Sequence, residues 1–287
     1  MDTNYSVLMS VYAKEKPCFL KESIASMLAQ TVKTDDFVIV CDGPLTPELD
    51  LVLQQYTQDN PDVFHIVRLA ENVGIGAAAE IGLQACKNDL VAKMDADDIS
   101  VPNRCQLQLA RFAENLSLTI IGSNIDEFDA DPNLPHAVRW VPADYESILK
   151  FGRRRQPFNN MTVMYKKSAV LAAGGYRPLR RNEDYDLYVR LLAKGYYAEN
   201  IPLSLVKVRV NTDAVHRRVS FGTVKGCVIS RWNAYKIGYA SLGDFLYCVI
   251  GQFIVFICPR KVQKWIYARF LRKGNAESDN KGEVIRE

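Results

Sequence analysis

The chain has 287 residues, of which 48% are apolar, so it can bury a sizeable core as one large α/β domain or a domain with an appendage. Its seven cysteines form no CxxC pair, which argues against a zinc cluster or a disulfide framework and suits a reducing cytosol. The first twenty residues contain no basic segment followed by a long apolar stretch, so we expect no signal peptide and a protein on the cytoplasmic side.

The charge is distributed unevenly along the chain. Residues 1–150 carry 11 Lys and Arg against 23 Asp and Glu, a net charge of −12, whereas residues 151–287 carry 25 against 10, a net charge of +15. This asymmetry favours an acidic half that holds a metal ion and a basic half that faces anions such as nucleic acid, phosphates or a lipid surface. A chance distribution of solvated charge is the alternative.

Short β-rich runs alternate with helical patterns through the first half. The segments "SVLMSVY" (6–12) and "DFVIVCDG" (36–43) predict strands, and helical spacing of apolar residues between them predicts a helix over 19–31. The next helix is predicted from Thr46 as N-cap and Pro47 as its first residue. The remaining predictions are strands at 64–69, 90–95 and 118–128 and helices at 76–87 and 102–115. This alternation predicts a largely parallel, doubly wound sheet with helices on both faces.

The composition of the chain changes from residue 150 onward. A polar segment is followed by "EDYDLYVRLLAKG" (183–195), which predicts an amphipathic helix ended by Gly195. The run "LSLVKVRV" (203–210) predicts a last strand, and a helical tail follows.

Three acids follow the predicted strand at 90–95. Asp95, Asp97 and Asp98 fall at its carboxyl end, where open α/β sheets place their ligands. Carboxylates so close in sequence repel one another unless a cation or hydrogen-bond donors hold them, and oxygen ligands favour Mg²⁺ or Mn²⁺. A solvated acidic turn that caps the next helix is the alternative.

Other polar residues stand at comparable positions. Ser10 and Tyr12 end the first predicted strand and Asp42 ends the second, so they line one edge if the strands are adjacent. A phenol ring can cover a nucleobase and a carboxylate can accept from its N–H, although packing and a turn are alternatives. Glu183 and Asp184 begin a helix, where capping is the simpler explanation and a general base is the other.

Together these motifs resemble the inverting family 2 glycosyltransferases of the GT-A fold. Within that family the chain is most similar to bacterial transferases that build exopolysaccharide, capsule or O-antigen units. The resemblance covers about residues 5–210 and rests on several ordered motifs at once. They are "SVLMSVYAKEKPCFLKESIASMLAQT" near the start, "VCDG" (40–43), "ENVG" (71–74), "MDADD" (94–98), "NNMTVMYKKSAVLAAGGY" (159–176) and "NEDYDLYVRLL" (182–192).

The resemblance implies a donor site for a UDP-sugar, with UDP-Glc or UDP-Gal as the expected donor. Tyr12 with Ser10 would contact the nucleobase, Asp42 would accept from the uracil N3–H, and Asn72 of "ENVG" would belong to the same nucleotide-binding set. Asp95 would reach the ribose or the donor sugar. The helix after that turn opens with "GIGAAAEIG", so it lacks the Arg or Asn that family members often place there for a phosphate.

The resemblance also implies the reacting groups. Asp97 would bind the Mn²⁺ or Mg²⁺ that bridges the diphosphate, Asp184 would be the general base, and Glu183 would orient it or hold the acceptor. One displacement would invert the anomeric carbon and give a β-linked hexose on a saccharide carried by polyprenyl diphosphate. Arg104 is also typical of the family, and we expect it to form a structural ion pair with the acid cluster.

Two other classes of protein stay open. Gly74-x-Gly76-x-x-Ala79 opens a helix, with Asp95 about twenty residues on, which is the spacing of a dinucleotide-binding NAD(P)-dependent oxidoreductase. A non-catalytic module that binds sugar nucleotides is the other alternative, but it would not need Asp97 and Asp184.

We expect a catalytic domain over 1–215 and a C-terminal helical, membrane-associating extension over 216–287. About fifteen mostly apolar residues at 244–258 are too few to span a bilayer, so an in-plane anchor on the cytoplasmic face is favoured, with a helical pair packed on the catalytic domain as the alternative. No nucleic-acid partner is expected, because aromatic residues do not interleave with the basic ones. Residues expected to dip into the headgroups are Trp265, Ile266, Phe270 and Leu271, and those expected to help hold acceptor phosphates are Arg153–Arg155, Arg177, Arg180 and Arg181.

Overall fold

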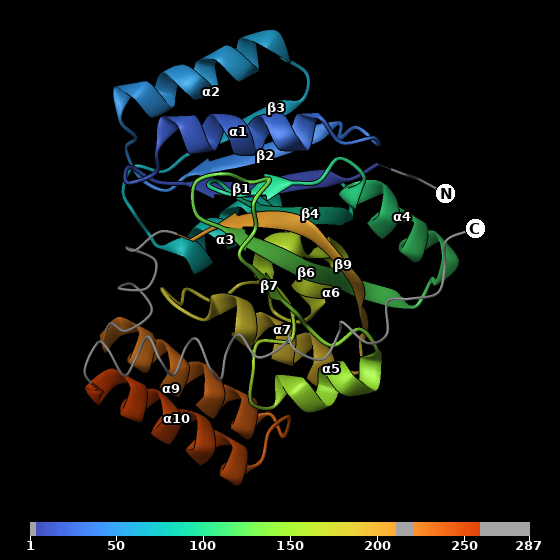
Figure 1. The fold of residues 1–287 in the computed structure, drawn as a ribbon, viewed down its shortest axis with the longest axis vertical. Helices are drawn as coiled ribbons and strands as arrows, with labels where there is room; N and C mark the ends of the chain where they lie inside the picture. The colour runs from blue at the N-terminus through green and yellow to red at the C-terminus, as the bar shows by residue number, and fades with distance from the viewer. Residues whose placement is uncertain (1–3, 211–220, 259–287) are drawn as a thin grey trace.

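A mixed sheet with helices on both faces forms the body of the protein (Figure 1). The computed structural model of the chain describes residues 4–210 and 221–258. Its strands are β1 (Ser6–Val11), β2 (Asp36–Cys41), β3 (Phe64–Arg68), β4 (Leu90–Asp95), β5 (Ile99–Ser100), β6 (Leu118–Phe128), β7 (Ala137–Arg139), β8 (Met164–Lys166) and β9 (Tyr197–Arg209). Its helices are α1 (Pro17–Leu28), α2 (Pro47–Asp59), α3 (Ile75–Ala85), α4 (Arg104–Glu114), α5 (Tyr145–Gly152), the 3₁₀ turn η1 (Asn160–Thr162), α6 (Lys167–Ala172), α7 (Glu183–Ala193), α9 (Phe221–Lys236) and α10 (Leu242–Ile257).

The sheet is mixed: it is parallel in its first half and again between β6 and β9. Its strand order is β3-β2-β1-β4-β8-β6-β9-β5, with β7 paired to β6. The pairs among β3, β2, β1 and β4 are parallel, as predicted, whereas β8 lies antiparallel to both β4 and β6. The prediction of a mostly parallel sheet therefore fails at β8, β5 and β7, which pair antiparallel with their neighbours, whereas β6 and β9 pair in parallel. Alternation of strands and helices determines parallel pairing, but the three-residue β8 follows a turn and enters the sheet through tertiary contacts.

Alternate residues of the buried strands fill two cores. Val7 and Met9 pack beneath α1 and α2 on one face, and Leu8 packs beneath α3 and α7 on the other. Both faces are apolar because helices cover both, which matches the continuous hydrophobic runs in the sequence. The N-terminus of α2 is also as predicted: Pro47 is its first residue and the Thr46 hydroxyl accepts from the Leu49 N–H at 3.4 Å.

The last strand and α7 differ from their predictions. β9 begins at Tyr197 rather than at 203, because it pairs with nearly all of β6 through a ladder that contains register shifts. α7 ends in the left-handed turn at Gly195, as predicted, but it is buried on almost all sides rather than amphipathic. The cause is α9, which packs on the outer side of α7 through Tyr185, Val189 and Ala234.

Helices α9 and α10 pack together at the end of the molecule opposite α2 (Figure 1). Asp244 is the one charged residue of α10, and its carboxylate forms a capping box with Ser241. Across the described residues, no helix is both long enough and apolar enough to cross a bilayer. The predicted headgroup contacts at 265–271 lie outside the described residues. The apolar side chains that α10 exposes are Leu242, Leu246, Tyr247, Ile250, Phe253, Ile254, Phe256 and Ile257.

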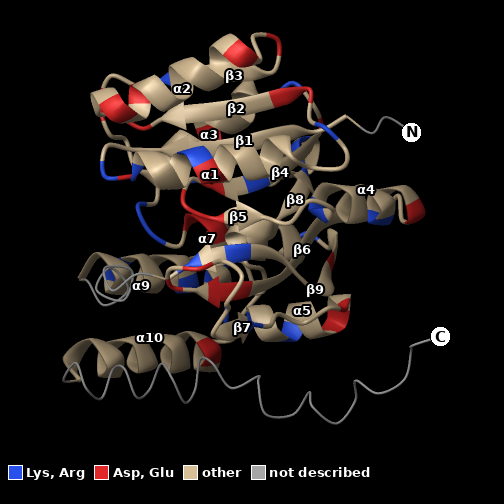
Figure 2. Ribbon diagram, turned by 45° about the horizontal axis from the view of Figure 1, so that its top comes forward, with Lys and Arg blue, Asp and Glu red and all other residues tan. Residues whose placement is uncertain are grey.

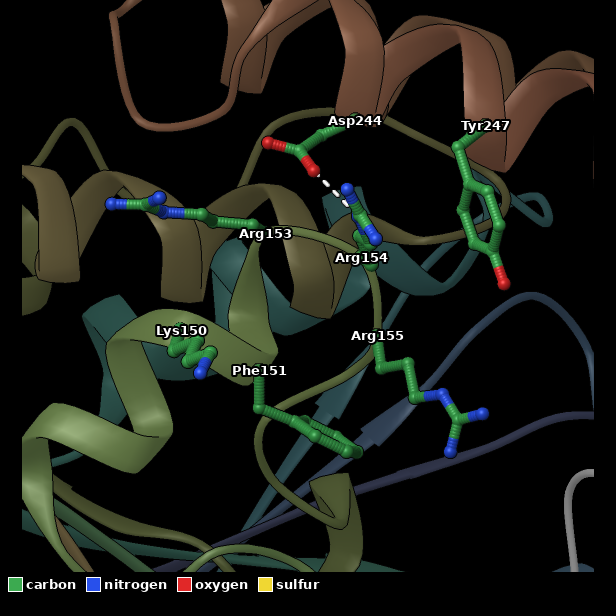
Figure 3. A pocket seen from close by; sticks show the side chains of 7 residues that line it. All are labelled: Lys150, Phe151, Arg153, Arg154, Arg155, Asp244 and Tyr247. Atoms are coloured by element: carbon green, nitrogen blue, oxygen red, sulfur yellow. Dashed lines mark hydrogen bonds and ion pairs between the residues drawn. The ribbon is translucent and has the colours of Figure 1, made fainter.

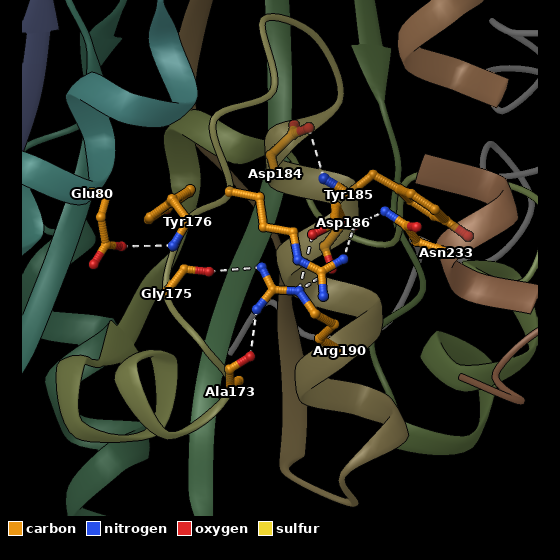
Figure 4. Close-up of polar contacts among 10 residues, drawn as sticks. Glu80, Ala173, Gly175, Tyr176, Asp184, Tyr185, Asp186, Arg190 and Asn233 are labelled. Carbon is orange, nitrogen blue, oxygen red and sulfur yellow. Dashed lines mark hydrogen bonds and ion pairs between the residues drawn. The ribbon is translucent and has the colours of Figure 1, made fainter. Parts of the chain in front are cut away.

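A buried carboxylate anchors α7 to its surroundings (Figure 4). Asp186 is fully buried and accepts from Arg190 at 2.9 Å, from Arg177 at 3.2 Å and from the amide of Asn233 at 3.0 Å. Arg190 also donates to the carbonyl oxygens of Ala173 and Gly175. These contacts join α7 to the loop before it and to α9.

We predict that Asp186→Ala lowers the free energy of unfolding by about 3 kcal/mol, because it leaves the buried Arg190 without its counter-ion. Urea unfolding followed by circular dichroism measures the change. The exposed Asp62 is the matched control, and Asp62→Ala should change stability by less than about 0.5 kcal/mol. Equal stabilities for the two variants would show that the buried network does not anchor α7.

Candidate active site

The carboxyl ends of the parallel strands meet at one edge of the sheet. Ser10 near the end of β1 is in register with Val40 of β2 on one side and with Asp95 of β4 on the other. Asp42 follows β2 directly, and its N–H donates to the carbonyl oxygen of Val11 at 2.8 Å. The prediction that these strand ends lie together is confirmed.

Figure 2 colours red the acidic turn between β4 and β5. The acids of this turn lie in different environments. Asp98 is buried and accepts from the backbone N–H of Arg209 at 3.1 Å, so it fastens the turn to β9. The carbonyl oxygen of Asp95 accepts from the Ser23 hydroxyl at 2.8 Å, which fastens the same turn to α1. Asp95 and Asp97 are half-buried, so their side chains border the sheet edge.

The carboxylates of this turn raise one another's pKa. Burial, and then the charge of Asp97, raise the pKa of Asp95 to about 6, and the same two causes raise the pKa of Asp98 well above its ordinary value. Lys93 lies buried two residues before Asp95 and opposes this effect. The turn therefore concentrates negative charge that a cation would stabilise.

The donor set at this turn fits a hard divalent cation. Only carboxylate oxygens are offered, which suits Mg²⁺ or Mn²⁺. Within residues 4–210 and 221–258, no three His, Cys, Asp or Glu side chains form a complete metal cage.

Asp42 and Asn72 bind one another in the structure. The Asp42 carboxylate accepts from the Asn72 side-chain amide at 3.0 Å and from the backbone N–H groups of Val73 and Gly74 at 2.8 and 3.2 Å. It therefore holds the loop after β3 against the loop after β2. A carboxylate has about four lone-pair sites, so this clamp leaves capacity for one more donor.

Ser10 and Tyr12 flank the same edge. The hydroxyl of Ser10 is buried and has no hydrogen-bond partner in the described structure. A buried polar group without a partner costs free energy, which makes this hydroxyl a candidate for ligand contact. Tyr12 is half-buried directly after β1.

The second acidic pair begins α7. The Asp184 carboxylate accepts from the backbone N–H of Tyr185 at 2.7 Å and from the side-chain amide of Gln156 at 2.5 Å. Burial raises the pKa of Asp184, and the charge of Asp184 contributes to the raised pKa of Asp95. The two acidic groups, which come from β4 and α7, therefore interact across one site.

Glu183 is the more strongly perturbed of the pair. Its side chain is buried, and burial followed by the charge of Asp184 raises its pKa to about 8. The protonated form of this carboxyl can donate a hydrogen bond as well as accept one.

Sequence reasoning missed two residues of this site. Gln156 lies in a loop 28 positions before Asp184, so no local pattern connects them. Lys93 was visible as a lone cation in the apolar run of β4, a signal that was not used. The predicted ion pair of Arg104 with the acids was wrong: this buried guanidinium donates to Gln108 and to the carbonyl oxygen of Lys93 at 2.7 Å.

The glycines before and within α3 have structural explanations. Gly74 has φ +91° and its N–H donates to Asp42. A Cβ on Gly76 would lie 2.3 Å from the carbonyl oxygen of Arg177 and 2.7 Å from that of Leu179. In dinucleotide-binding folds the second glycine admits the pyrophosphate. Here the protein's own segment 177–179 occupies that approach, which argues against the oxidoreductase alternative.

Comparison with known proteins points to one family. The family model described as glycosyl transferase family 2 matches residues 6–182. An uncharacterised glycosyltransferase of Haemophilus influenzae is 39% identical over 273 residues, which cover 94% of this chain and 99% of the relative. A UDP-Gal:alpha-D-GlcNAc-diphosphoundecaprenol beta-1,3-galactosyltransferase of Escherichia coli is 33% identical over 270 residues, which cover 94% and 97%. The amylovoran biosynthesis glycosyltransferase AmsE of Erwinia amylovora is 33% identical over 275 residues, which cover 94% and 100%.

Solved structures share the fold. The S. aureus TarS fragment 1–349 in complex with UDP-GlcNAc superposes with a TM-score of 0.67 at 14% identity, over 92% of this chain and 79% of that one. The mannosyltransferase PcManGT from Pyrobaculum calidifontis in complex with GDP-Man and Mn²⁺ superposes with a TM-score of 0.60 at 14% identity, over 91% and 82%. Together with the family match, these superpositions confirm the expected GT-A-like α/β fold.

We predict that Glu183→Gln stabilises the metal-free protein at high pH. Because folding raises the pKa of Glu183 to about 8, stability contributed by its protonated form is present below pH 4.5 and is lost as the pH rises through 8. The variant keeps a neutral side chain, so at pH 8.5 it should be more stable than the parent by about 1 kcal/mol or more. Thermal unfolding in a chelating buffer measures this difference.

The exposed Glu71 provides the control, because Glu71→Gln should leave the pH dependence of unfolding unchanged. A Glu183→Gln protein that is equally stabilised at pH 4.5 and pH 8.5 would contradict the raised pKa.

Proposed function

The chain belongs to glycosyl transferase family 2, and we propose that it is an inverting, metal-dependent hexosyltransferase of bacterial surface polysaccharide synthesis. Its donor is a UDP-sugar, UDP-Glc or UDP-Gal, and its acceptor is a saccharide linked to a lipid diphosphate. One observation supports the proposal most directly: Asp95 at the end of β4, Asp97 just after it and Asp184 at the start of α7 come from two separate elements, and the charges of Asp97 and Asp184 both contribute to the raised pKa of Asp95.

The donor side of the proposed site consists of the strand ends. The Ser10 hydroxyl and the Tyr12 ring contact the nucleobase, and Asp42, held by Asn72, accepts from the uracil N3–H. The unpartnered hydroxyl of Ser10 supports this role. Asp95 reaches the ribose or the donor sugar.

Asp97, with Asp95 beside it, would hold Mn²⁺ or Mg²⁺. When bound, such an ion neutralises the negative charge that develops on the departing nucleoside diphosphate. The oxygen-only donor set and the crowded carboxylates of the turn support this assignment.

The acceptor side of the proposed site is the start of α7. Asp184 takes the proton from the attacking hydroxyl, which displaces the nucleoside diphosphate from the opposite face of the sugar and inverts the anomeric carbon. An α-linked donor then gives a β-linked product. Gln156 orients the Asp184 carboxylate through its amide, and Glu183 holds the acceptor or the base.

We assign residues 1–215 to the catalytic domain and 216–287 to an extension that associates with the membrane. The exposed apolar residues of α10 support a peripheral position on the cytoplasmic face, where a lipid-linked acceptor is within reach. That position also agrees with the name of the Escherichia coli relative, which specifies a diphosphoundecaprenol acceptor.

We predict that Asp97→Ala and Asp184→Asn separate donor binding from transfer. Asp97→Ala should abolish metal-dependent binding of the UDP-sugar, whereas Asp184→Asn should leave binding intact and lower kcat by about 100-fold or more because the base is lost. Calorimetric titration of UDP-sugar with and without Mn²⁺, together with UDP release in the presence of a lipid-diphosphate-linked acceptor, measures both effects.

In the same assays, Asp62→Asn serves as a control for an exposed acid outside the site. Loss of donor binding in Asp184→Asn would show that the residue is a structural cap. The proposed function would be refuted if the parent protein released no UDP from any UDP-sugar in a panel of donors.

We predict that Gln156→Ala lowers kcat roughly 10-fold to 100-fold and leaves UDP-sugar binding unchanged, because the base loses its orienting contact. The Gln156 hydrogen bond lowers the pKa of Asp184, so the variant's Asp184 should have a higher pKa. The acid limb of the kcat–pH profile should therefore move to higher pH. Gln55→Ala on the exposed face of α2 is the matched control, and an unmoved acid limb in Gln156→Ala would exclude the positioning role.

A further inference from the structure

A basic pocket lies between the end of α5, the loop after it and α10 (Figure 3). Its volume is about 450 Å³. Four cations and a single carboxylate line it, together with two aromatic rings. We propose that this pocket, given the proposed function, binds the diphosphate of the lipid-linked acceptor. The lining residues are Lys150, Phe151, Arg153, Arg154, Arg155, Asp244 and Tyr247.

One of the four cations belongs to the wall of the pocket. Arg154 forms an ion pair with Asp244 at 2.5 Å, and its guanidinium lies over the Tyr247 ring at 4.9 Å. These contacts bind the loop after α5 to the start of α10 and neutralise one charge. Arg154 therefore holds the pocket together.

The other three cations are available to an anion. Lys150, Arg153 and Arg155 are exposed, and in the described parts of the chain none of them forms an ion pair with an acid. Guanidinium groups bind phosphate oxygens in a bidentate manner, and a lysine adds a mobile point charge. Three unneutralised cations around one cavity thus match the charge of a diphosphate.

The residue that contacts the proposed base follows a pocket residue directly in the chain. Gln156, which donates to Asp184, is the next residue after Arg155, and consecutive Cα atoms lie about 3.8 Å apart. On the other side, Arg231 donates to the carbonyl oxygen of Arg153, and its guanidinium stacks on the Tyr185 ring at 3.6 Å. A saccharide whose diphosphate occupied the pocket would therefore extend toward Asp184.

The surroundings distinguish this pocket from the donor site. The donor's diphosphate needs the metal-binding acids after β4, whereas the one acid of this pocket is already paired with Arg154. α10 continues from the pocket as an exposed apolar helix, along which a lipid chain would lie toward the bilayer. An anion site beside an apolar surface suits a lipid diphosphate better than a free nucleotide.

The other arginines expected to hold acceptor phosphates are not part of this pocket. Arg177 pairs with the buried Asp186. The side chain of Arg180 packs on Gly74, where a Cβ would lie 3.1 Å from the Arg180 Cγ. Among the arginines in the described part of the chain, those at 153–155 line the cavity.

The test uses the full chain carrying Arg153→Gln and Arg155→Gln together, in neutral detergent. Calorimetry with undecyl diphosphate should show at least 10-fold weaker binding than in the parent. In UDP release assays, the KM for an alkyl-diphosphate-linked N-acetylglucosamine should rise at least 10-fold, while the KM for the UDP-sugar stays unchanged. The exposed Lys194, at the far end of α7, supplies the control Lys194→Gln, which removes a surface cation outside the pocket and should behave as the parent.

Three outcomes would overturn the assignment. Parent-like binding of undecyl diphosphate by the double variant would exclude the pocket. Equal binding of undecanol and undecyl diphosphate by the parent would show that the phosphates are not recognised. Loss of binding to phosphatidylglycerol vesicles with an unchanged acceptor KM would show that the pocket binds anionic headgroups instead. A parent protein that binds undecyl diphosphate but transfers no sugar would refute the proposed function and leave the diphosphate site standing.

Discussion

The buried carboxylate of Asp186 determines where the acids at the start of α7 can act. An ionised group inside a protein is stable only when hydrogen bonds and counter-ions satisfy it, and Asp186 is satisfied by Arg190, Arg177 and Asn233. These partners belong to α7, to the preceding loop and to α9. Since Asp184 is two residues earlier on the same helix, its position depends on that network. Asp186, which has no proposed role in the reaction, therefore helps to position Asp184, the proposed base.

The same electrostatic reasoning explains how the site tolerates so many acids. Asp95 and Asp98 on one side and Glu183 and Asp184 on the other all have raised pKa values, and burial is the largest cause for each. Lys93 lies beneath them as a partial counter-charge, with its own pKa lowered by burial. Repulsion among these carboxylates raises the free energy of the folded protein, and a ligand that brings positive charge or hydrogen-bond donors lowers it.

The C-terminal helices α9 and α10 join the candidate active site to an exposed apolar surface. α9 covers α7 and replaces the solvent that an amphipathic helix would face, while α10 leaves a row of apolar side chains exposed. The arginines of the loop after α5 lie between α10 and Gln156, so the apolar surface, the basic pocket and the base follow one another in space. This order agrees with an enzyme whose acceptor arrives from a membrane, and it gives the basic half of the chain a task distinct from that of the acidic half.

The sequence by itself determined the parallel pairing of β1 to β4 and the edge of the sheet where Ser10, Asp42 and Asp95 meet. Apolar runs end in Ser10, Asp42 and Asp95, and adjacent parallel strands must bring such ends together, so local pattern was enough. Only the tertiary structure decided the rest. The antiparallel β8, the full burial of α7 and the binding of Arg104 to backbone carbonyls rather than to acids all depend on contacts between distant segments. The hydrogen bond between Gln156 and Asp184, which are 28 positions apart, could not be predicted either. A contact between distant segments produces no periodic pattern in the sequence, whereas strand ends and helix starts do.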